Sequence, residues 1–270
     1  MGRGETEELE QVVSDDGTPI AVWRSGEGAP LVLVHGTAAD HSRWAPVLPR
    51  LAERFTVLAV DRRGRGRSGD ADGYALEREF EDVAAVVDWA GDAVNALGHS
   101  HGGVCALGAA LRTDRVRRLV LYEPPLGFLA TPADVVDRLE ALLDAGERDE
   151  LLAYFMRQVA GLSPAQVEML RSLPAWEKRL AAAPTIPREE RANRHYAFEP
   201  ERFGGLQVPT LFLGGGDSPD WSRTAGESLR AALPNCRVVV MPGQGHAAID
   251  TGTDLFAAEV LRFLNAIQGG

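Results

Sequence analysis

The sequence contains few cysteines and no long apolar segment. Its two cysteines, Cys105 and Cys236, fall in what the pattern predicts to be a helix interior and a strand start. Two thiols are too few for a disulfide framework or a zinc cluster. No apolar run of about 18 residues occurs, and the N-terminal stretch MGRGETEELEQ lacks the apolar core of a signal peptide. We therefore expect a cytoplasmic protein with reduced thiols.

The sequence also lacks an excess of basic residues. It has 28 Lys and Arg against 39 Asp and Glu, which gives a formal net charge of −11. A surface of this sign repels nucleic acids and anionic lipids. We expect a small-molecule substrate as partner, and neither a nucleic acid nor a membrane. The sequence indicates no oligomeric state.

What is present is typical of a globular α/β protein. The 270 residues are 45% hydrophobic and 25% charged, enough for one large domain with an insertion. Continuous apolar runs predict parallel strands buried on both faces. These runs are residues 31–34, 55–60, 94–97, 118–122, 210–213 and 237–241. Residues 11–23 alternate around an Asp-Gly turn, which predicts a hairpin at a sheet edge.

Segments with helical spacing lie between these runs, at 44–51, 80–89, 104–111, 222–233 and 253–267. The alternation predicts a doubly wound, mostly parallel sheet. Residues 131–202 interrupt it, since they hold helical segments at 133–143, 150–159 and 165–173 and no strand. We therefore expect a core made of residues 1–130 and 203–270, with an inserted helical cap at 131–202.

The segment Gly98-His99-Ser100-His101-Gly102 follows an apolar strand and precedes a helix start that is rich in small residues. This G-x-S-x-G pattern places its serine on a strained turn at the end of a strand. Glycines at its two ends allow neighbouring backbone to approach. The pattern makes Ser100 a candidate nucleophile.

A serine nucleophile needs a base within hydrogen-bond reach. His99 and His101 flank Ser100 on a sharp turn where successive side chains diverge, so we expect neither ring to face it. His246 follows the last apolar run, at the carboxyl edge of the predicted sheet where ligands bind in such folds. We therefore predict His246 as the base.

The base in turn needs a carboxylate that holds its tautomer. Asp217 follows the run 210–213 in GGGD, and the order Ser100, Asp217, His246 is the one expected for this fold. Glu123 follows another strand in LYEPP and stays open as the alternative acid. Asp220 is a third candidate.

The loop His35-Gly36-Thr37 follows the first apolar run, so the backbone N–H of Thr37 is placed to point at the serine. With the N–H of His101 it would bind an oxyanion. We expect His35 to brace this loop.

The stretch DRRGRGRSG at residues 61–69 matches a dinucleotide-binding pattern, but its glycines lead into the loop DADGY rather than a helix. We therefore expect an Arg-rich turn held by Asp61.

Five motifs in order, HGTAADHSRW, DRRGRGRSG, GHSHGG, GGGD and GQGH, resemble the α/β-hydrolase superfamily over residues 11–267. The resemblance implies a triad of Ser100, His246 and Asp217, oxyanion donors at Thr37 and His101, a helical lid, and no cofactor or metal. Superfamily members that open epoxides or remove halogens carry aspartate at the elbow, which Ser100 argues against. The acid loop is about one residue shorter than the usual pattern, which keeps Glu123 open.

These features predict a serine hydrolase that cleaves an ester or thioester of a small to medium apolar acid through an acyl-enzyme. A carbon–carbon bond hydrolase or lyase with the same triad is the alternative, and a non-catalytic small-molecule-binding protein is a further one. Five cap residues either line the pocket or fill the cap core: Tyr154, Phe155, Met156, Met169 and Trp176.

Overall fold

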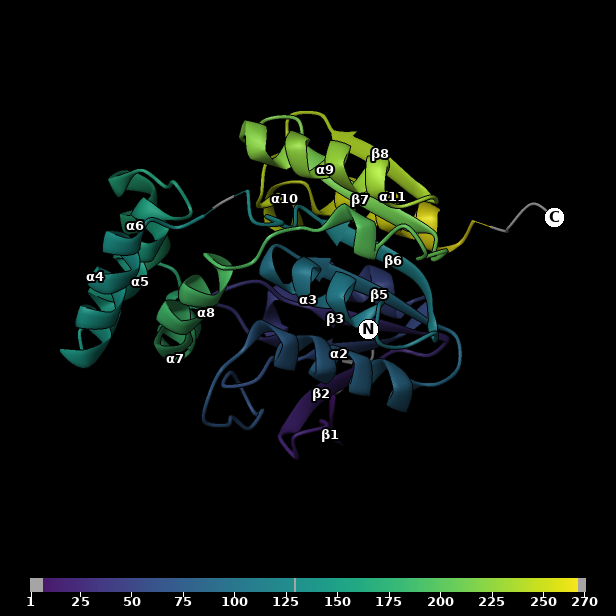
Figure 1. The fold of residues 1–270 in the computed structure, drawn as a ribbon, viewed down its shortest axis with the longest axis horizontal. Coiled ribbons are helices and arrows are strands. Elements are labelled where there is room, and N and C mark those ends of the chain that lie inside the picture. The colour runs from purple at the N-terminus through teal and green to yellow at the C-terminus, as the bar shows by residue number, and fades with distance from the viewer. Residues whose placement is uncertain (1–6, 129, 267–270) are drawn as a thin grey trace, which may run out of the picture.

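A computed structural model describes residues 7–128 and 130–266 (Figure 1). Its centre is one eight-stranded sheet in the order β1-β2-β4-β3-β5-β6-β7-β8. The strands are β1 (Glu8–Val13), β2 (Pro19–Ser25), β3 (Ala29–Val34), β4 (Phe55–Val60), β5 (Val94–His99), β6 (Val116–Tyr122), β7 (Thr210–Gly215) and β8 (Cys236–Met241). All pairs from β4 to β8 are parallel. The predicted α/β fold with a mostly parallel sheet is confirmed.

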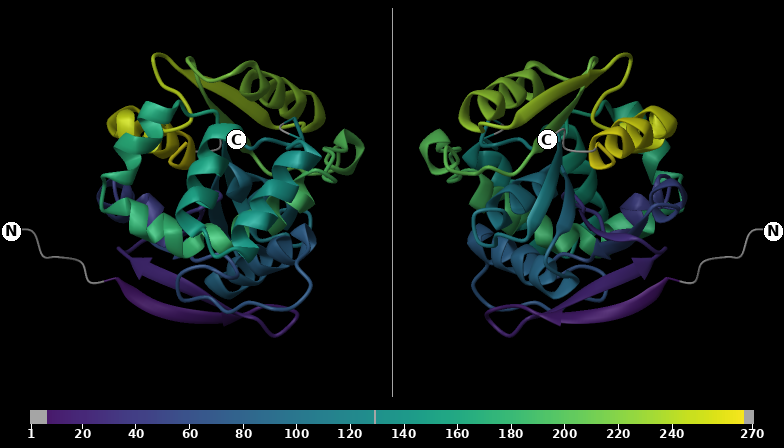
Figure 2. Two further views of the ribbon diagram at one scale, coloured as in Figure 1. Left: turned by 90° about the vertical axis from the view of Figure 1, so that its left-hand side faces the viewer. Right: turned by 90° about the vertical axis from the view of Figure 1, so that its right-hand side faces the viewer.

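The predicted hairpin lies at one edge of the sheet, and β8 lies at the opposite edge (Figure 2). β1 and β2 pair in antiparallel register, from Glu8 opposite Arg24 to Val13 opposite Pro19. Gly17 has φ +85°, which the turn between the two strands requires. The Asp-Gly signal in the sequence is thereby explained.

Helices cover both faces of the sheet, which accounts for the continuous apolar runs. Val32 and Val34 belong to one apolar cluster, and Leu31 and Leu33 belong to the other. The first cluster packs under α2 (Leu76–Ala90), α3 (His101–Ala109) and α9 (Asp220–Ala232), and the second under α1 (Leu48–Ala52) and α11 (Thr253–Leu264). Successive strand residues point to opposite faces, so a strand covered on both sides is apolar throughout.

The segment between β6 and β7 forms helices that gather at one end of the molecule, on the left of Figure 1. These are α4 (Ala133–Asp144), α5 (Arg148–Gln158), α6 (Pro164–Arg171), α7 (Ala175–Ala182) and α8 (Ile186–Asn193), with short 3₁₀ turns η2 (Ala183–Thr185) and η3 (Pro200–Arg202). They enclose an apolar cluster of their own that includes Leu139, Leu151 and Ile186. The division of the chain at residues 131 and 202 stays a prediction.

Two predicted helices differ in detail from those observed. Residues 44–51 do not form one helix. The 3₁₀ turn η1 (His41–Trp44) ends at Trp44, and α1 begins only at Leu48, with a proline as its second residue. The last helix ends at Leu264, and Ile267, predicted to belong to it, lies outside the described residues. A further short helix, α10 (Ala248–Thr251), precedes it. None of the helices within residues 7–128 and 130–266 is long and apolar enough to cross a membrane.

Candidate active site

Ser100 occupies the sharp turn between β5 and α3. Its φ of 54° and ψ of −126° are rarely adopted by residues with a side chain, and such strain is typical of functional positions. A Cβ on Gly98 would lie 2.3 Å from the carbonyl oxygen of Gly102, and a Cβ on Gly102 would lie 2.3 Å from that of Val34. The spacing of the G-x-S-x-G motif therefore has a steric cause, because both end positions exclude any side chain.

The two histidines beside the serine are packed away from it. His99 stacks on Tyr122 with ring centroids 4.8 Å apart, and its Nε2 lies 3.2 Å from the carbonyl oxygen of His246. His101 is buried at the start of α3, where burial and then the charge of Arg62 hold its pKa well below the usual value. Neither ring makes a hydrogen bond to Ser100, as the turn geometry predicts.

His246 lies in the loop between β8 and α10, beside the serine. Ser100, His99 and His246 all line one cavity of about 310 Å³. The imidazole of His246 is half exposed and meets Trp221 edge to face, with centroids 5.6 Å apart. No hydrogen bond joins Ser100 Oγ to this ring in the structure. Nucleophile and base often come within hydrogen-bond reach only when substrate binds.

The acid that contacts the imidazole is Glu123. Its Oε2 lies 2.7 Å from His246 Nδ1, while its Oε1 accepts hydrogen bonds from the backbone N–H of Gly215 at 2.8 Å and the hydroxyl of Ser222 at 2.7 Å. Burial alone would raise the pKa of this carboxyl, but the hydrogen bonds from His246 and Gly215 outweigh it, so its pKa is lowered. Glu123 is therefore ionised next to the ring.

Asp217, which the sequence favoured for this position, lies elsewhere. It is exposed, and its backbone N–H donates to the carbonyl oxygen of Gln244 at 2.9 Å. The reason is its distance from the strand: β7 ends at Gly215, and the loop then turns toward solvent. Glu123 instead follows β6 directly, with φ +46° and its N–H bonded to Leu213. Asp220 is also exposed, with 95% of its side chain accessible.

The two predicted oxyanion donors lie at the same cavity. A Cβ on Gly36 would lie 3.1 Å from Ser100 Cβ, so the loop that carries Thr37 passes close to the serine. Both Thr37 and His101 line the cavity, and neither backbone N–H donates to another described group. His35 braces this loop as expected, because its Nδ1 lies 2.8 Å from the oxygen of Gly36 and its Nε2 accepts the N–H of Arg62. The oxyanion role itself stays a prediction.

The Arg-rich turn is held by Asp61, as the sequence predicts. The buried carboxylate accepts the backbone N–H groups of His41 and Arg67 and the indole N–H of Trp23, at 2.8–2.9 Å. The glycines of this stretch lead into a loop, and α2 begins only at Leu76. The turn therefore lacks the strand-to-helix geometry of a dinucleotide site.

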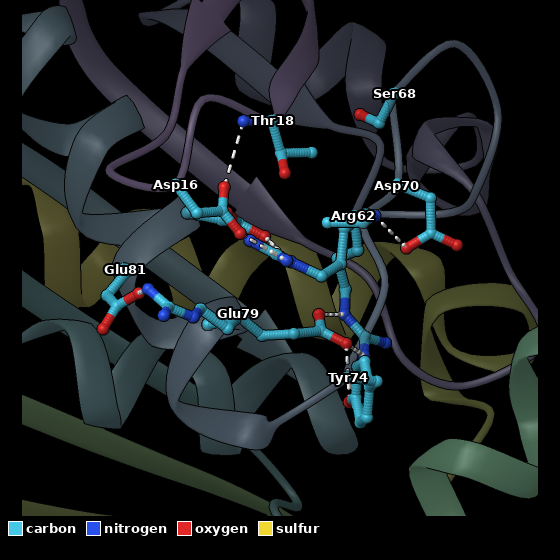
Figure 3. Close-up of polar contacts among 12 residues, drawn as sticks. Asp16, Thr18, Arg62, Ser68, Asp70, Tyr74, Glu79 and Glu81 are labelled. Carbon is cyan, nitrogen blue, oxygen red and sulfur yellow. Dashed lines mark hydrogen bonds and ion pairs between the residues drawn. The ribbon is translucent and has the colours of Figure 1, made fainter.

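A buried ion-pair network, which the sequence did not reveal, lies next to this turn. Arg62 donates to Glu79 on α2 and to Glu189 on α8, each at 2.6 Å, and Tyr74 donates to Glu79 at 2.8 Å. Figure 3 shows Arg62, Glu79 and Tyr74 facing one another. Arg65 pairs with both glutamates. Its sequence signal is Glu79, which falls among the buried apolar positions of α2. The two arginines lie in a loop and Glu189 lies in a largely polar helix, so their pairing has no signal in the sequence.

Glu79, His101 and Cys105 converge closely enough to be considered as metal ligands, since their ligand atoms lie within 4.8 Å of one another. Both oxygens of Glu79 are already bonded to the guanidinium of Arg62. A second cation beside two arginines would be repelled. These residues therefore do not fit a metal ion.

The cavity wall shows where the five cap residues lie. Phe155 and Met156 line the cavity, whereas Trp176 is buried in the apolar cluster of the segment between β6 and β7, called the insertion below, and its Nε1 donates to Asp149. Tyr154 packs against that cluster, and Met169 is 58% exposed. Six polar or aromatic wall residues were not predicted from the sequence: Arg43, Arg179, Glu190, Asn193, Trp221 and Asp250.

Comparison with known proteins defines the class. A model of the alpha/beta hydrolase family matches residues 31–259, and the chain belongs to this family. A crystal structure of an alpha/beta hydrolase from Sphaerobacter thermophilus DSM 20745 is 38% identical, with a TM-score of 0.84, over 95% of this chain and 100% of that chain. An esterase from Rhodococcus sp. ECU1013 is 27% identical, with a TM-score of 0.76, over 96% and 98%.

A relative known by sequence is a putative carbamate hydrolase from Azorhizobium caulinodans, 26% identical over 90% of this chain and 94% of its own. This chain is accordingly a hydrolase of the alpha/beta family. The bond that it cleaves is a separate question.

Proposed function

We propose that the protein hydrolyses a carboxylic ester or thioester through a triad of Ser100, His246 and Glu123. The observation that carries this proposal is the buried, ionised Glu123 at 2.7 Å from His246 Nδ1, in the cavity onto which Ser100 opens. The similarity to an esterase supports the reaction class. The substrate is a small molecule, since the cavity is about 310 Å³ and the net charge of −11 disfavours nucleic acids.

In this proposal His246 Nε2 takes the proton of Ser100 as Oγ attacks the substrate carbonyl carbon. The carbonyl oxygen becomes an oxyanion that accepts hydrogen bonds from the N–H groups of Thr37 and His101. The tetrahedral intermediate collapses, and the leaving alkoxide or thiolate takes the proton from His246. Water then gives its proton to His246 and attacks the acyl-serine. When this second tetrahedral intermediate collapses, Ser100 Oγ leaves and takes the proton back from His246, and the acid is released. Glu123 accepts Nδ1–H throughout, which fixes the tautomer and stabilises the imidazolium.

The test is turnover of a p-nitrophenyl ester together with labelling by a fluorophosphonate. Wild-type protein should hydrolyse the ester, and the probe should label Ser100 alone by peptide mapping. Ser100→Ala should keep its fold and lose both properties, with kcat lowered by up to about a million-fold. The matched control is Ser172→Ala, at an exposed serine outside the cavity, which should be labelled and active like wild type.

The same experiment separates the alternatives. Labelling of Ser100 without ester turnover would favour carbon–carbon bond cleavage by the same residues. Neither labelling nor turnover by folded protein would favour a non-catalytic binding protein and overturn the proposal.

A further inference from the structure

The cavity beside Ser100 has one charged side within a largely apolar wall. Arg43 on η1, Arg179 on α7 and Asp250 on α10 line it together. Much of the remaining wall is contributed by side chains of the insertion: Phe155, Met156, Val159, Leu162 and Leu170. Charged side chains in such a wall require partners, because an unpaired charge next to apolar groups is costly.

Arg43 has such a partner, and Arg179 does not. Arg43 Nη1 lies 2.9 Å from Asp250 Oδ1 and 2.8 Å from Oδ2. Within residues 7–128 and 130–266, no carboxylate lies within 4 Å of the Arg179 guanidinium, and no side-chain hydrogen bond engages it. The charge of Arg43 is therefore neutralised by Asp250, and the guanidinium of Arg179 is free to bind an anion.

The electrostatic surroundings agree with this arrangement. Burial and then repulsion from Arg43 lower the pKa of Arg179, although Asp250 and Asp40 act in the opposite direction. Asp40 is itself occupied by the backbone N–H and hydroxyl of Ser42. The nearby acids thus leave the charge of Arg179 incompletely compensated.

The remaining acid of the cavity wall does not alter this balance. Glu190 on α8 accepts a hydrogen bond from the hydroxyl of Thr131 and makes no ion pair with Arg179. Burial raises its pKa to about 7. It therefore carries little negative charge in weakly acidic solution.

We propose that the substrate carries an anionic group, a carboxylate or its equivalent, that binds Arg179 next to Arg43 while its carbonyl lies at Ser100. This proposal rests on the hydrolase function above and narrows its substrate class to half-esters or half-thioesters of dicarboxylic acids. Arg179 presents a planar set of donors that matches two carboxylate oxygens. The apolar wall accommodates the hydrocarbon between the two ends.

The first experiment compares pairs of p-nitrophenyl esters. One member is a half-ester of a dicarboxylic acid, in a series from succinate to suberate. The other is a neutral ester of the same shape, in which an isopropyl group replaces the carboxylate. At least one half-ester should exceed its neutral partner in kcat/KM by about ten- to a hundredfold, the range of a charge-assisted hydrogen bond.

The second experiment changes the cation. In Arg179→Gln the ratio of kcat/KM for the half-ester to kcat/KM for the neutral ester should fall close to one, mostly because KM for the half-ester rises. Arg179→Lys keeps the positive charge and should retain part of the preference for the half-ester. The matched control is Arg157→Gln, at an arginine of the same insertion that pairs with Glu150 instead. This control should keep the wild-type ratio.

Binding provides a readout that does not depend on turnover. The dicarboxylate that matches the preferred half-ester should bind Ser100→Ala in calorimetry, and binding should weaken by about tenfold or more when Arg179→Gln is added. The proposal is overturned if no half-ester is preferred, or if Arg179→Gln keeps the preference. Failure of the proposed function is a different result, in which neither member of any pair is hydrolysed.

Discussion

Glu123 and Asp217 follow neighbouring parallel strands at the same edge of the sheet, yet only Glu123 contacts His246. Glu123 comes directly after the last residue of β6 and is completely buried, and three donors surround its carboxylate. Asp217 comes two residues after β7, at an exposed turn. The comparison teaches that a position near a strand end is not sufficient to bring a carboxylate to the imidazole. The acid must also follow its strand directly, at a residue whose backbone turns the side chain inward, as Glu123 does with φ +46°.

The largest expected effect tests this comparison directly. Glu123→Gln should lower kcat for an aryl ester by about ten-thousand-fold, because an amide cannot hold the correct tautomer of His246 or stabilise its charged form. Asp217→Asn is the matched control and should stay within about twofold of wild type, as surface changes do. Circular dichroism and thermal unfolding would verify that both variants fold. Loss of activity in Asp217→Asn alone would make Asp217 the acid.

A smaller effect on activity is expected for Ser222, which contacts Glu123 and not His246. Ser222 is buried on α9 and donates to Glu123 Oε1, so Ser222→Ala leaves part of the carboxylate unpaired. We expect a loss of about 1.5–3 kcal/mol in unfolding free energy, together with a fall of roughly tenfold in kcat. Urea denaturation and ester kinetics measure the two. Thr224→Ala, at an exposed position of the same helix, should change neither; equal losses in both variants would contradict the assignment.

The smallest expected effect is the contribution of Glu123 to the pH dependence of stability. Its folded pKa is lowered, so its charged form stabilises the fold above its ordinary pKa of about 4.3. This contribution should disappear as the pH falls below that value and through the folded pKa. Unfolding free energies of wild type and Glu123→Gln, measured between neutral pH and pH of about 3, should therefore converge. Asp217→Asn should track wild type throughout, and a constant difference for Glu123→Gln would contradict the prediction.

Local sequence patterns predict the parts of the site that backbone geometry determines. The strand runs and the Gly-x-Ser-x-Gly spacing are sufficient to place Ser100 at the end of β5. Gly98 is required by a contact within the same turn, with Gly102, whereas Gly102 is required by the backbone of the neighbouring strand at Val34. His246 follows from its position after the last strand. The Asp-Gly hairpin is equally local.

Other parts depend on pairing and packing that no short pattern contains. The direction of Glu123 depends on the pairing of β6 with β7 and on a positive φ. Glycine and asparagine are the usual residues at such a φ, so a glutamate does not signal it in the sequence. α7 and α8, each eight residues long, were not predicted from the sequence. Arg179 on α7 reaches the cavity only through the packing of the whole insertion, so its place was not predictable.

The ion pairs of Arg62 and Arg65 restrict which sequences the segment between β6 and β7 can have. Both arginines belong to the loop after β4, whereas one of their two glutamates, Glu189, is contributed by the insertion. An exchange of the insertion for that of another hydrolase would leave the two buried cations with Glu79 alone, unless the incoming helix brought a carboxylate to the same place. The part of the chain that shapes the substrate cavity is therefore not an independent module. The two arginines of the loop after β4 require a carboxylate at the position of Glu189 in α8.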